Sequence, residues 1–345
     1  VCVINDLLKK ENVPNIGERL KTFSACYEEK KVDERSYIEE VITKTKAEKN
    51  YIFPDPEEFL KEIEDIVWHQ EEPFGGTSMF AQWKVLKKAR EKVKVLLDGQ
   101  GGDENLCGYR KFYFFYLKGL YERKKYSLFF KEFLQFFSSI DILKTLNLKS
   151  GFRYINYGNK LFKIEDLINH SFLEKFKERK INFSYQKNLG NRIKEDITKW
   201  SLPVLLRFED KNSAASSIET RLPFLDYRLV EKIGTLPLDT KLNNGWTKFI
   251  LRNSLKGILP EKIRLRKSKL GFSTPQDSWM RYNLYENIKS TFKNSTFLQD
   301  YVNKEQLLKS LDLFSRGQTI ITGEILFRFY SMELWGRKFI IKKNH

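Results

Sequence analysis

The sequence predicts an α/β fold with a parallel sheet, because short apolar strands alternate with helical patterns over the first hundred residues. RLKTFSAC, residues 19–26, has the composition of a strand. The run of Val93, Val95, Leu96 and Leu97 is typical of the end of a second strand, buried on both faces. Ligands of such sheets bind at the carboxyl ends of the strands, which is where a Gly-rich stretch follows Leu97.

Helical patterns separate and follow these strands. Residues 1–10 resemble the middle of an amphipathic helix, since no N-cap residue precedes them. Residues 111–190 carry aromatic and leucine side chains at helical spacing, which predicts a helical insertion whose aromatic stripes form core. The chain after Trp200 is expected to be mostly helical. The other predicted helices cover residues 34–49, 55–70 and about 78–92.

The composition predicts a folded protein without a membrane segment. With 345 residues, 41% hydrophobic and 14% aromatic, the chain can bury a sizeable core as one large or two ordinary domains. No run approaches about 18 uninterrupted apolar residues. The start, VCVINDLLKK, lacks the basic and apolar regions of a secretory signal, so a cytoplasmic location is the expectation.

Neither structural metal nor nucleic acid is favoured by the composition. Three cysteines and three histidines are too few and too scattered for a disulfide framework or a zinc site. The net charge of +17 would suit nucleic acid, but the basic residues are interleaved with acidic ones, as in KAREKVK. We expect a lysine-rich solvated surface, whose field also favours an anionic substrate such as a nucleotide.

The stretch VLLDGQGGDENLCGYR joins a strand to a Gly-rich turn and an acidic pair. Gly99, Gly101 and Gly102 allow positive φ and close approach of backbone N–H groups to a ligand. Asp103 and Glu104 supply hard oxygen ligands for a divalent cation. The combination suits a nucleotide phosphate with its metal. A Gly-rich turn with solvated acids is the alternative, and this stretch alone does not separate the two.

Two further clusters place polar residues beside small ones. HQEEPFGGTSMFAQW, residues 69–83, has an acidic pair and two glycines ahead of a probable helix, and a capped helix after a turn explains most of it. DKNSAASSIETRLPFLDYRLV, residues 210–230, would hold charged groups on rigid elements because its small residues let backbones approach. A structural ion-pair network is the alternative there. The charged residues are Lys211, Glu219, Arg221 and Asp226.

The other two clusters are basic. In LNNGWTKFILR, residues 242–252, Lys248 and Arg252 are expected on one face of an amphipathic helix that follows a turn. LPEKIRLRKSKLGFSTP, residues 259–275, is a basic loop that ends in a Gly-Phe pair before proline. A solvated face is the ordinary interpretation. A lysine carried to a phosphate is the alternative, because lysine acts as a mobile point charge on phosphoryl groups.

Taken together and in this order, four motifs resemble the synthetase domain of the glutamine-hydrolysing asparagine synthetases, a family of pyrophosphatase-loop ATP enzymes. They are DGQGGDExxxGY, SIETRLPFLDYRLV, GWTKxxLR and LPxxIRxRKxKLGFSTP, and EEPFGGTSMFAQW resembles the segment ahead of the first. The resemblance covers about residues 19–335, with a loose match in the helical insertion. It implies a parallel sheet of the adenine-nucleotide α-hydrolase (Rossmann-like) type, with a large helical insertion and a helical C-terminal part.

The resemblance implies an ATP-dependent ligase of asparagine biosynthesis. In the family, the side-chain carboxylate of aspartate attacks the α-phosphorus of ATP, pyrophosphate leaves with Mg²⁺, and ammonia displaces AMP from the β-aspartyl adenylate. ATP and Mg²⁺ would be the cofactors. Aspartate and ammonia would be the partners, with ammonia delivered from a glutaminase domain absent from this chain. A homodimer is compatible with the family, and neither nucleic acid nor a membrane is implied.

Motif matching also implies residue roles. The nucleotide-binding residues would be Ala25, Asp98, Gly99, Gly101 and Gly102. The catalytic residues would be Gln100, Asp103, Glu104, Lys211, Glu219, Arg221 and Lys269. Asp103 would also be the metal ligand, while Gln100 would neighbour the adenylate and Glu104 the aspartate. Lys211 and Lys269 match the cationic residues on the phosphates and the transition state, and Lys267 is the rival for Lys269.

The sequence departs from the family pattern in two ways. The phosphate-binding S-G-G-x-D-S loop, expected just ahead of the first helix, is not found in these residues. The glutaminase domain with its nucleophilic cysteine is not found either, and Cys2 lies in an apolar helical run typical of a buried structural cysteine. We therefore expect this chain to lack glutaminase activity and to handle pyrophosphate poorly. Robust AMP formation dependent on aspartate and ammonia would contradict the second expectation.

One domain over residues 1–345 is expected, with three parts. These are an α/β nucleotide-binding core at 1–110, a helical insertion at 111–195 and a mostly helical part at 196–345 that completes the active site. Alternative functions are another ATP-dependent amide-forming enzyme on the same scaffold and a catalytically impaired interaction module. A relative acting on transfer RNA would instead show steeply salt-dependent RNA binding.

Overall fold

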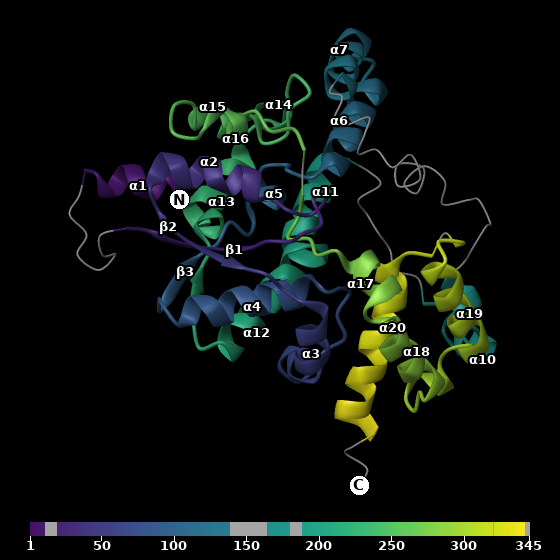
Figure 1. Cartoon of the computed structure of the whole chain (residues 1–345). Coiled ribbons are helices and arrows are strands. Elements are labelled where there is room, and N and C mark those ends of the chain that lie inside the picture. The colour runs from purple at the N-terminus through teal and green to yellow at the C-terminus, as the bar shows by residue number, and fades with distance from the viewer. Residues whose placement is uncertain (11–18, 139–163, 180–187, 269, 320, 342–345) are drawn as a thin grey trace.

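The chain is an α/β protein, as expected, with two small parallel sheets surrounded by many helices (Figure 1). The computed structural model describes residues 1–10, 19–138, 164–179, 188–268, 270–319 and 321–341. One sheet pairs β1 with β2, and the other pairs β3 with β4. The strands are β1 (Lys21–Ala25), β2 (Glu48–Ile52), β3 (Val95–Leu97) and β4 (Glu219–Arg221).

Helices make up most of the described residues. In the first part of the chain they are α1 (Cys2–Leu8), α2 (Arg35–Thr45), α3 (Pro56–Gln70), α4 (Ser78–Arg90), α5 (Gly102–Asn105), α6 (Arg110–Glu122), α7 (Tyr126–Phe137), α10 (His170–Phe176) and α11 (Leu189–Glu195). They continue as α12 (Leu202–Ala215), α13 (Tyr227–Thr235), α14 (Leu238–Lys241), α15 (Phe249–Ser254), α16 (Glu261–Arg264), α17 (Gln276–Tyr282), α18 (Tyr285–Lys293), α19 (Lys304–Ser315) and α20 (Gly323–Gly336). No helix among the described residues is long and apolar enough to cross a membrane.

The helix that the sequence predicts over residues 34–49 is too long, because its last residues belong to a strand. α2 ends at Thr45, because Lys46 takes a left-handed conformation with φ 58° and its N–H caps the carbonyl of Ile42. β2 then begins at Glu48 and pairs in parallel with β1. The strand was not predicted because its sequence, EKNYI, is polar and has little of the β-branched composition of a strand.

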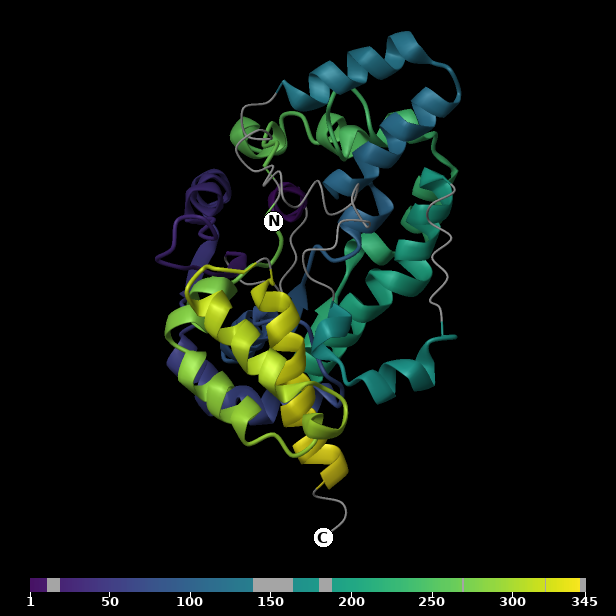
Figure 2. The ribbon, with the colours of Figure 1, turned by 90° about the vertical axis from the view of Figure 1, so that its right-hand side faces the viewer.

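α3 begins and ends as the sequence predicts, and it anchors the larger core. Asp55 caps the helix by accepting hydrogen bonds from the N–H groups of Glu57 and Glu58. The buried face of α3 packs with α4 and with the C-terminal helices, which lie beside α3 in both views (Figures 1 and 2). Leu326 and Phe327 of α20 lie fully buried in this cluster, so the C-terminal part completes the core of the first part.

A second core lies at the base of α6 and α7, the two helices that rise away from the sheets in Figure 1. The ring of Phe136 stacks on Tyr113 with centroids 4.3 Å apart. Phe112, Tyr113 and Tyr116 of α6 are buried as expected, whereas Phe114 and Tyr121 are exposed. The stripe of α7 is not all core, since Phe130 and Leu134 are 61% and 66% exposed. Within the described part of the chain α7 packs against α6, and Phe130 and Leu134 lie on the side that these residues leave uncovered.

The prediction that β3 is buried on both faces is wrong. Leu96 packs against Leu86, Ala89 and Ile218, whereas Val95 and Leu97 are 38% and 49% exposed. Side chains alternate between the faces of a strand. α4 and the residue before β4 cover the face of Leu96, and the opposite face lacks comparable cover in the described part of the chain.

Candidate functional site

The candidate site begins where β3 and β4 end side by side. The two strands run parallel, with Leu97 opposite Arg221, and the N–H of Asp98 extends the ladder by donating to the carbonyl of Arg221 at 3.0 Å. The Gly-rich turn after β3 and the end of β4 therefore lie at the same edge. This pairing brings together two motifs that are more than one hundred residues apart in the sequence.

The turn from Asp98 to Gly102 is held by its own side chains and by the Pro223–Leu225 turn. Asp98 accepts from the N–H of Gln100 at 3.0 Å, and burial raises the pKa of the Asp98 carboxyl while these backbone bonds oppose the rise. Gly101 has φ +86°, and a Cβ there would clash with the side chain of Leu225. Only glycine fits this position without strain, as the sequence suggests.

Asp103 and Glu104, both in α5, have different surroundings. Asp103 is mostly buried and forms an ion pair of 3.0 Å with the ammonium of Lys248. Glu104 is 1% exposed, and its Oε1 accepts hydrogen bonds from the hydroxyls of Tyr109 at 2.6 Å and Ser201 at 2.9 Å. Burial and the Glu104 carboxylate raise the pKa of the Tyr109 hydroxyl. Of the two acids, Asp103 is the more accessible to a ligand.

Sequence reasoning missed the partners of these two acids. Lys248 was expected on a helix face with Arg252, but it is the N-cap of α15, with φ 52°. Arg252 instead donates to the carbonyls of Thr247 and Arg264.

Ser201 ends the π-helical segment Asp196–Trp200 and starts α12, so its hydroxyl reaches Glu104 only through the packing of α5 on that segment. No short-range pattern in the sequence signals either contact.

Several expected site residues lie elsewhere or pair with protein groups. Ala25 ends β1, in the other sheet, and pairs with Ile52. Lys211 forms an ion pair with Glu71 at the end of α3. Glu219 and Arg221 are exposed and pair with each other at 2.7 Å across one strand face. Lys269 lies outside the described residues.

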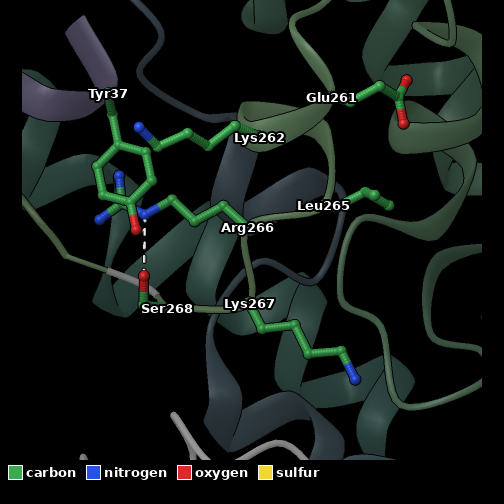
Figure 3. Close-up of a pocket in the computed structure, with 7 residues that line it drawn as sticks. All are labelled: Tyr37, Glu261, Lys262, Leu265, Arg266, Lys267 and Ser268. Carbon is green, nitrogen blue, oxygen red and sulfur yellow. Dashed lines mark hydrogen bonds between the residues drawn. The ribbon is translucent and has the colours of Figure 1, made fainter. Parts of the chain in front are cut away.

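The rival, Lys267, lines an open cavity of about 440 Å³ between α2 and the basic loop (Figure 3). Figure 3 shows the Arg266 guanidinium lying over the ring of Tyr37 and donating a hydrogen bond to the hydroxyl of Ser268. The side chain of Lys267 points away from Tyr37 and Ser268. Lys267 lies 4.6 Å from the ring centroid of Trp246, and burial followed by Arg252 lowers the pKa of its ammonium.

The other two cations at this cavity are already neutralised. Arg266 pairs with Glu34 at 2.6 Å, and Lys262 pairs with Glu40 at 2.8 Å. Both carboxylates come from α2 or from the residue that precedes it. The cavity is therefore basic in composition, but Lys267 is the lining cation best placed to meet an added anion.

Comparisons of the sequence with known proteins identify the family. The sequence model of the asparagine synthase family matches residues 2–337. The chain is 28% identical over 85% of its length to asparagine synthetase [glutamine-hydrolyzing] 1 of Bacillus subtilis, covering 48% of that protein. It is 28% identical over 55% of its length to asparagine synthetase 2 of the same organism, covering 23% of it.

A fungal protein is also similar. The amidase chyE of Penicillium rubens is 23% identical over 80% of the chain, which covers 46% of the amidase. The chain thus spans about half the length, or less, of these curated relatives. Because the family match extends over nearly all of the 345 residues, the chain belongs to the asparagine synthase family.

Proposed function

We propose that the chain carries out the ATP-dependent step of an asparagine synthetase. Aspartate would attack the α-phosphorus of ATP to give β-aspartyl-AMP and pyrophosphate, and ammonia would then release asparagine and AMP. The observation that supports this proposal is the meeting of the Gly-rich turn and the end of β4 at one sheet edge, with Asp103 beside it. Family membership supplies the reaction class.

The turn would hold the phosphates, and its charges suit that role in part. N–H groups of a Gly-rich turn can approach phosphate oxygens closely, and the left-handed Gly101 opens the start of α5 for this approach. Arg221 lies exposed at the end of β4, where its pairing with Glu219 is open to exchange with an anionic substrate. Glu104 is enclosed by two hydroxyls, so we assign it to shaping the aspartate side rather than to proton transfer.

Mg²⁺ fits the site through one residue. The described residues contain no group of three or more His, Cys, Asp or Glu side chains that could hold a metal. Mg²⁺ often takes only one or two carboxylates and completes its shell with phosphates and water. Asp103, freed from Lys248, would hold the ion, which when bound would offset the charge of the phosphates.

We also infer that the two sheets are parts of one parallel sheet of the adenine-nucleotide α-hydrolase type. Phe23 of β1 and Leu96 of β3 pack into the same cluster on α4, which supports a shared layer. In this arrangement residues 1–110 form the nucleotide core, 111–195 the helical insertion and 196–345 the part that completes the site. The packing of α20 on α3 supports one domain.

The proposal is tested by incubating the protein with ATP, Mg²⁺, aspartate and ammonium chloride. The expected products are AMP, pyrophosphate and asparagine in equal amounts, formed slowly because these residues contain no S-G-G-x-D-S loop, and omission of aspartate should stop AMP formation. AMP formation that does not depend on aspartate, or none at all by a folded protein, would contradict the proposal.

One second candidate is an ATP-dependent amide-forming enzyme of the same scaffold that uses another carboxylic acid, since the chain is also similar to a Penicillium protein that is named an amidase and not an asparagine synthetase. The same assay separates the two when aspartate is replaced by a panel of other carboxylic acids. AMP formation with one of those acids and not with aspartate would replace asparagine synthesis by this alternative.

A further inference from the structure

Glu209 is a buried acid that the proposed reaction does not use. It lies within α12 and is 3% exposed, beneath the sheet edge that carries the candidate site. Its polar neighbours are Gln82 of α4, which donates a hydrogen bond to its carboxyl group, and Thr220 of β4. Glu209 thus lies between a helix and the strand that pairs with β3.

A row of side-chain amides fixes the orientation of this carboxyl group. Gln82 donates to Oε2 of Glu209 and accepts from the amide of Asn212 at 2.8 Å. Asn212 in turn accepts from the amide of Gln70 at 2.8 Å. Because Gln82 uses its N–H group as the donor, one oxygen of Glu209 has a defined partner. The other oxygen, Oε1, is buried and has no hydrogen-bond partner among the described residues.

Among the residues that the structure describes, the charged neighbours of Glu209 offer no compensation for a negative charge. Asp98, at the end of β3, is the charged group that acts on it, and the interaction is repulsive. The basic residues on α12 face other acids. Arg207 pairs with Glu72, and Lys211 pairs with Glu71, at the end of α3.

The remaining elements packed on α12 contribute no cation to Glu209 either. α4 and β4 present the neutral side chains of Gln82 and Thr220. The π-helical segment presents Asp196, whose carboxylate is bound by Lys111 and Arg192. An ionised carboxylate with one orphaned oxygen and a like charge nearby is costly to bury, and protonation removes that cost.

We propose that Glu209 is held as the neutral acid in the folded protein and positions the nucleotide turn, so that its ionisation loosens the end of β3 and weakens nucleotide binding. Neutral Glu209 lets α4 and β4 close beneath Asp98, while ionised Glu209 repels Asp98 and draws in water. The nucleotide part of this inference rests on the proposed function. Glu209 is a positioning residue, because it acts through Asp98 and Thr220 rather than on a substrate.

The direction of the pH effect follows from the burial of the group. Burial, followed by the charge of Asp98, raises the pKa of Glu209 from 4.5 to about 7. An acid whose pKa is raised on folding destabilises the fold as pH rises from its unfolded pKa to its folded pKa. The stability loss therefore accumulates between pH 4.5 and about 7, and above that range the ionised form predominates.

The protonation part is tested by thermal unfolding of the full chain across this pH range. In E209Q the side chain has nearly the same shape as glutamate but cannot ionise. E231Q, which replaces an exposed glutamate on α13, is the matched control. The Tm of E209Q minus that of wild type should increase by at least about 2 °C from acidic to mildly alkaline pH, and E231Q should show no such trend. A difference that is constant with pH would overturn the inference.

The positioning part is tested by titrating MgATP into wild type and E209Q by calorimetry at mildly acidic and mildly alkaline pH. E209Q is the reference because ATP titrates in the same way in both experiments, so the ratio of the two affinities does not contain the pH dependence of ATP itself. The affinity of wild type relative to E209Q should fall about threefold to tenfold at the higher pH. A constant ratio would overturn this part. If ATP binds neither protein at any pH, the proposed function fails, and the Tm series still decides the protonation of Glu209.

A wild-type measurement covers the case in which E209Q does not fold. The infrared absorption of a protonated carboxyl group should decline in wild type as pH rises through about 7. Absence of that absorption at mildly acidic pH would contradict a neutral Glu209.

Discussion

The acids of the candidate site and the cations that the sequence assigns to the reaction are held in different ways. The acids lie on short elements and are fixed by near neighbours: Asp98 by the N–H groups of its own turn, and Glu104 by two hydroxyls. The cations are long side chains that pair with carboxylates of the surrounding fold. Lys211 pairs with Glu71, and Arg266 pairs with Glu34.

This difference shows which half of the site is formed without a substrate. Short side chains on a turn and a helix lose little entropy when they are fixed, so the fold can place them in advance. Lysine and arginine have long flexible chains and bind the nearest carboxylate when no phosphate is present. Asp103 and Lys248 lie between the two cases, because a fixed acid there meets a cation from the far part of the chain.

The largest expected effect is the loss of activity when Asp103, the acid that pairs with Lys248, is neutralised. D103N removes the charge that would hold Mg²⁺ and pair with Lys248. We expect the kcat/KM for AMP formation to fall by at least about 100-fold, since groups that offset charge in a transition state have effects of this size. D65N, on the exposed face of α3, is the control. A loss below about threefold would mean that the acidic side is not part of the site.

The next effect concerns the shape of the turn. G101A forces a side chain into φ +86° and against Leu225, so the free energy of unfolding should fall by about 1–3 kcal/mol. G99A is a matched control two residues away, because nothing lies within 4 Å of an added Cβ there. Chemical denaturation measures both variants. Equal stability losses would show that the turn does not need a left-handed residue.

A smaller effect is expected from the support of Glu104. Y109F or S201A removes one hydroxyl from a buried carboxylate, which should lower the free energy of unfolding by about 1–2 kcal/mol. S254A removes a hydroxyl that donates to a backbone carbonyl on the surface, and should change stability little. If S201A and S254A have the same stability, Glu104 is not held as described.

The smallest effect is expected on the basic side. K211A breaks a partly exposed ion pair with Glu71, so the Tm should stay within about 2 °C of that of wild type. The affinity of the same variant for MgATP, measured by titration, tests whether the Lys211 ammonium binds the phosphates in place of Glu71. A Tm drop well beyond that range would show that the Lys211 pair is as structural as the hydroxyls around Glu104.

The sequence predicts the parts of the molecule that depend on near neighbours. The cap at Asp55, the ends of α3, the strand of residues 21–25 and the left-handed glycine in the turn all follow from local rules. β2 was missed because its five residues are polar, and its pairing with β1 supplies the stability that its composition does not.

The partners of the site residues could not be predicted in the same way. The pairs of Lys248 with Asp103 and of Ser201 with Glu104 join residues about one hundred or more positions apart. Their contact depends on how α15 and the π-helical segment pack, which no local pattern encodes. The burial of Glu209 could not be predicted for a related reason. An acid followed by Asp210 and Lys211 is typical of a solvated helix face, and only the packing of α12 shows that it is buried.

Calorimetric titration of MgATP into the wild-type protein and into D103N tests the central claim most directly. The claim is that the Gly-rich turn and Asp103 form the binding site of a magnesium nucleotide. The expected result is saturable binding to wild type with a single site, and affinity at least about tenfold weaker in D103N. Equal affinities in two folded proteins would place the nucleotide elsewhere and contradict the claim.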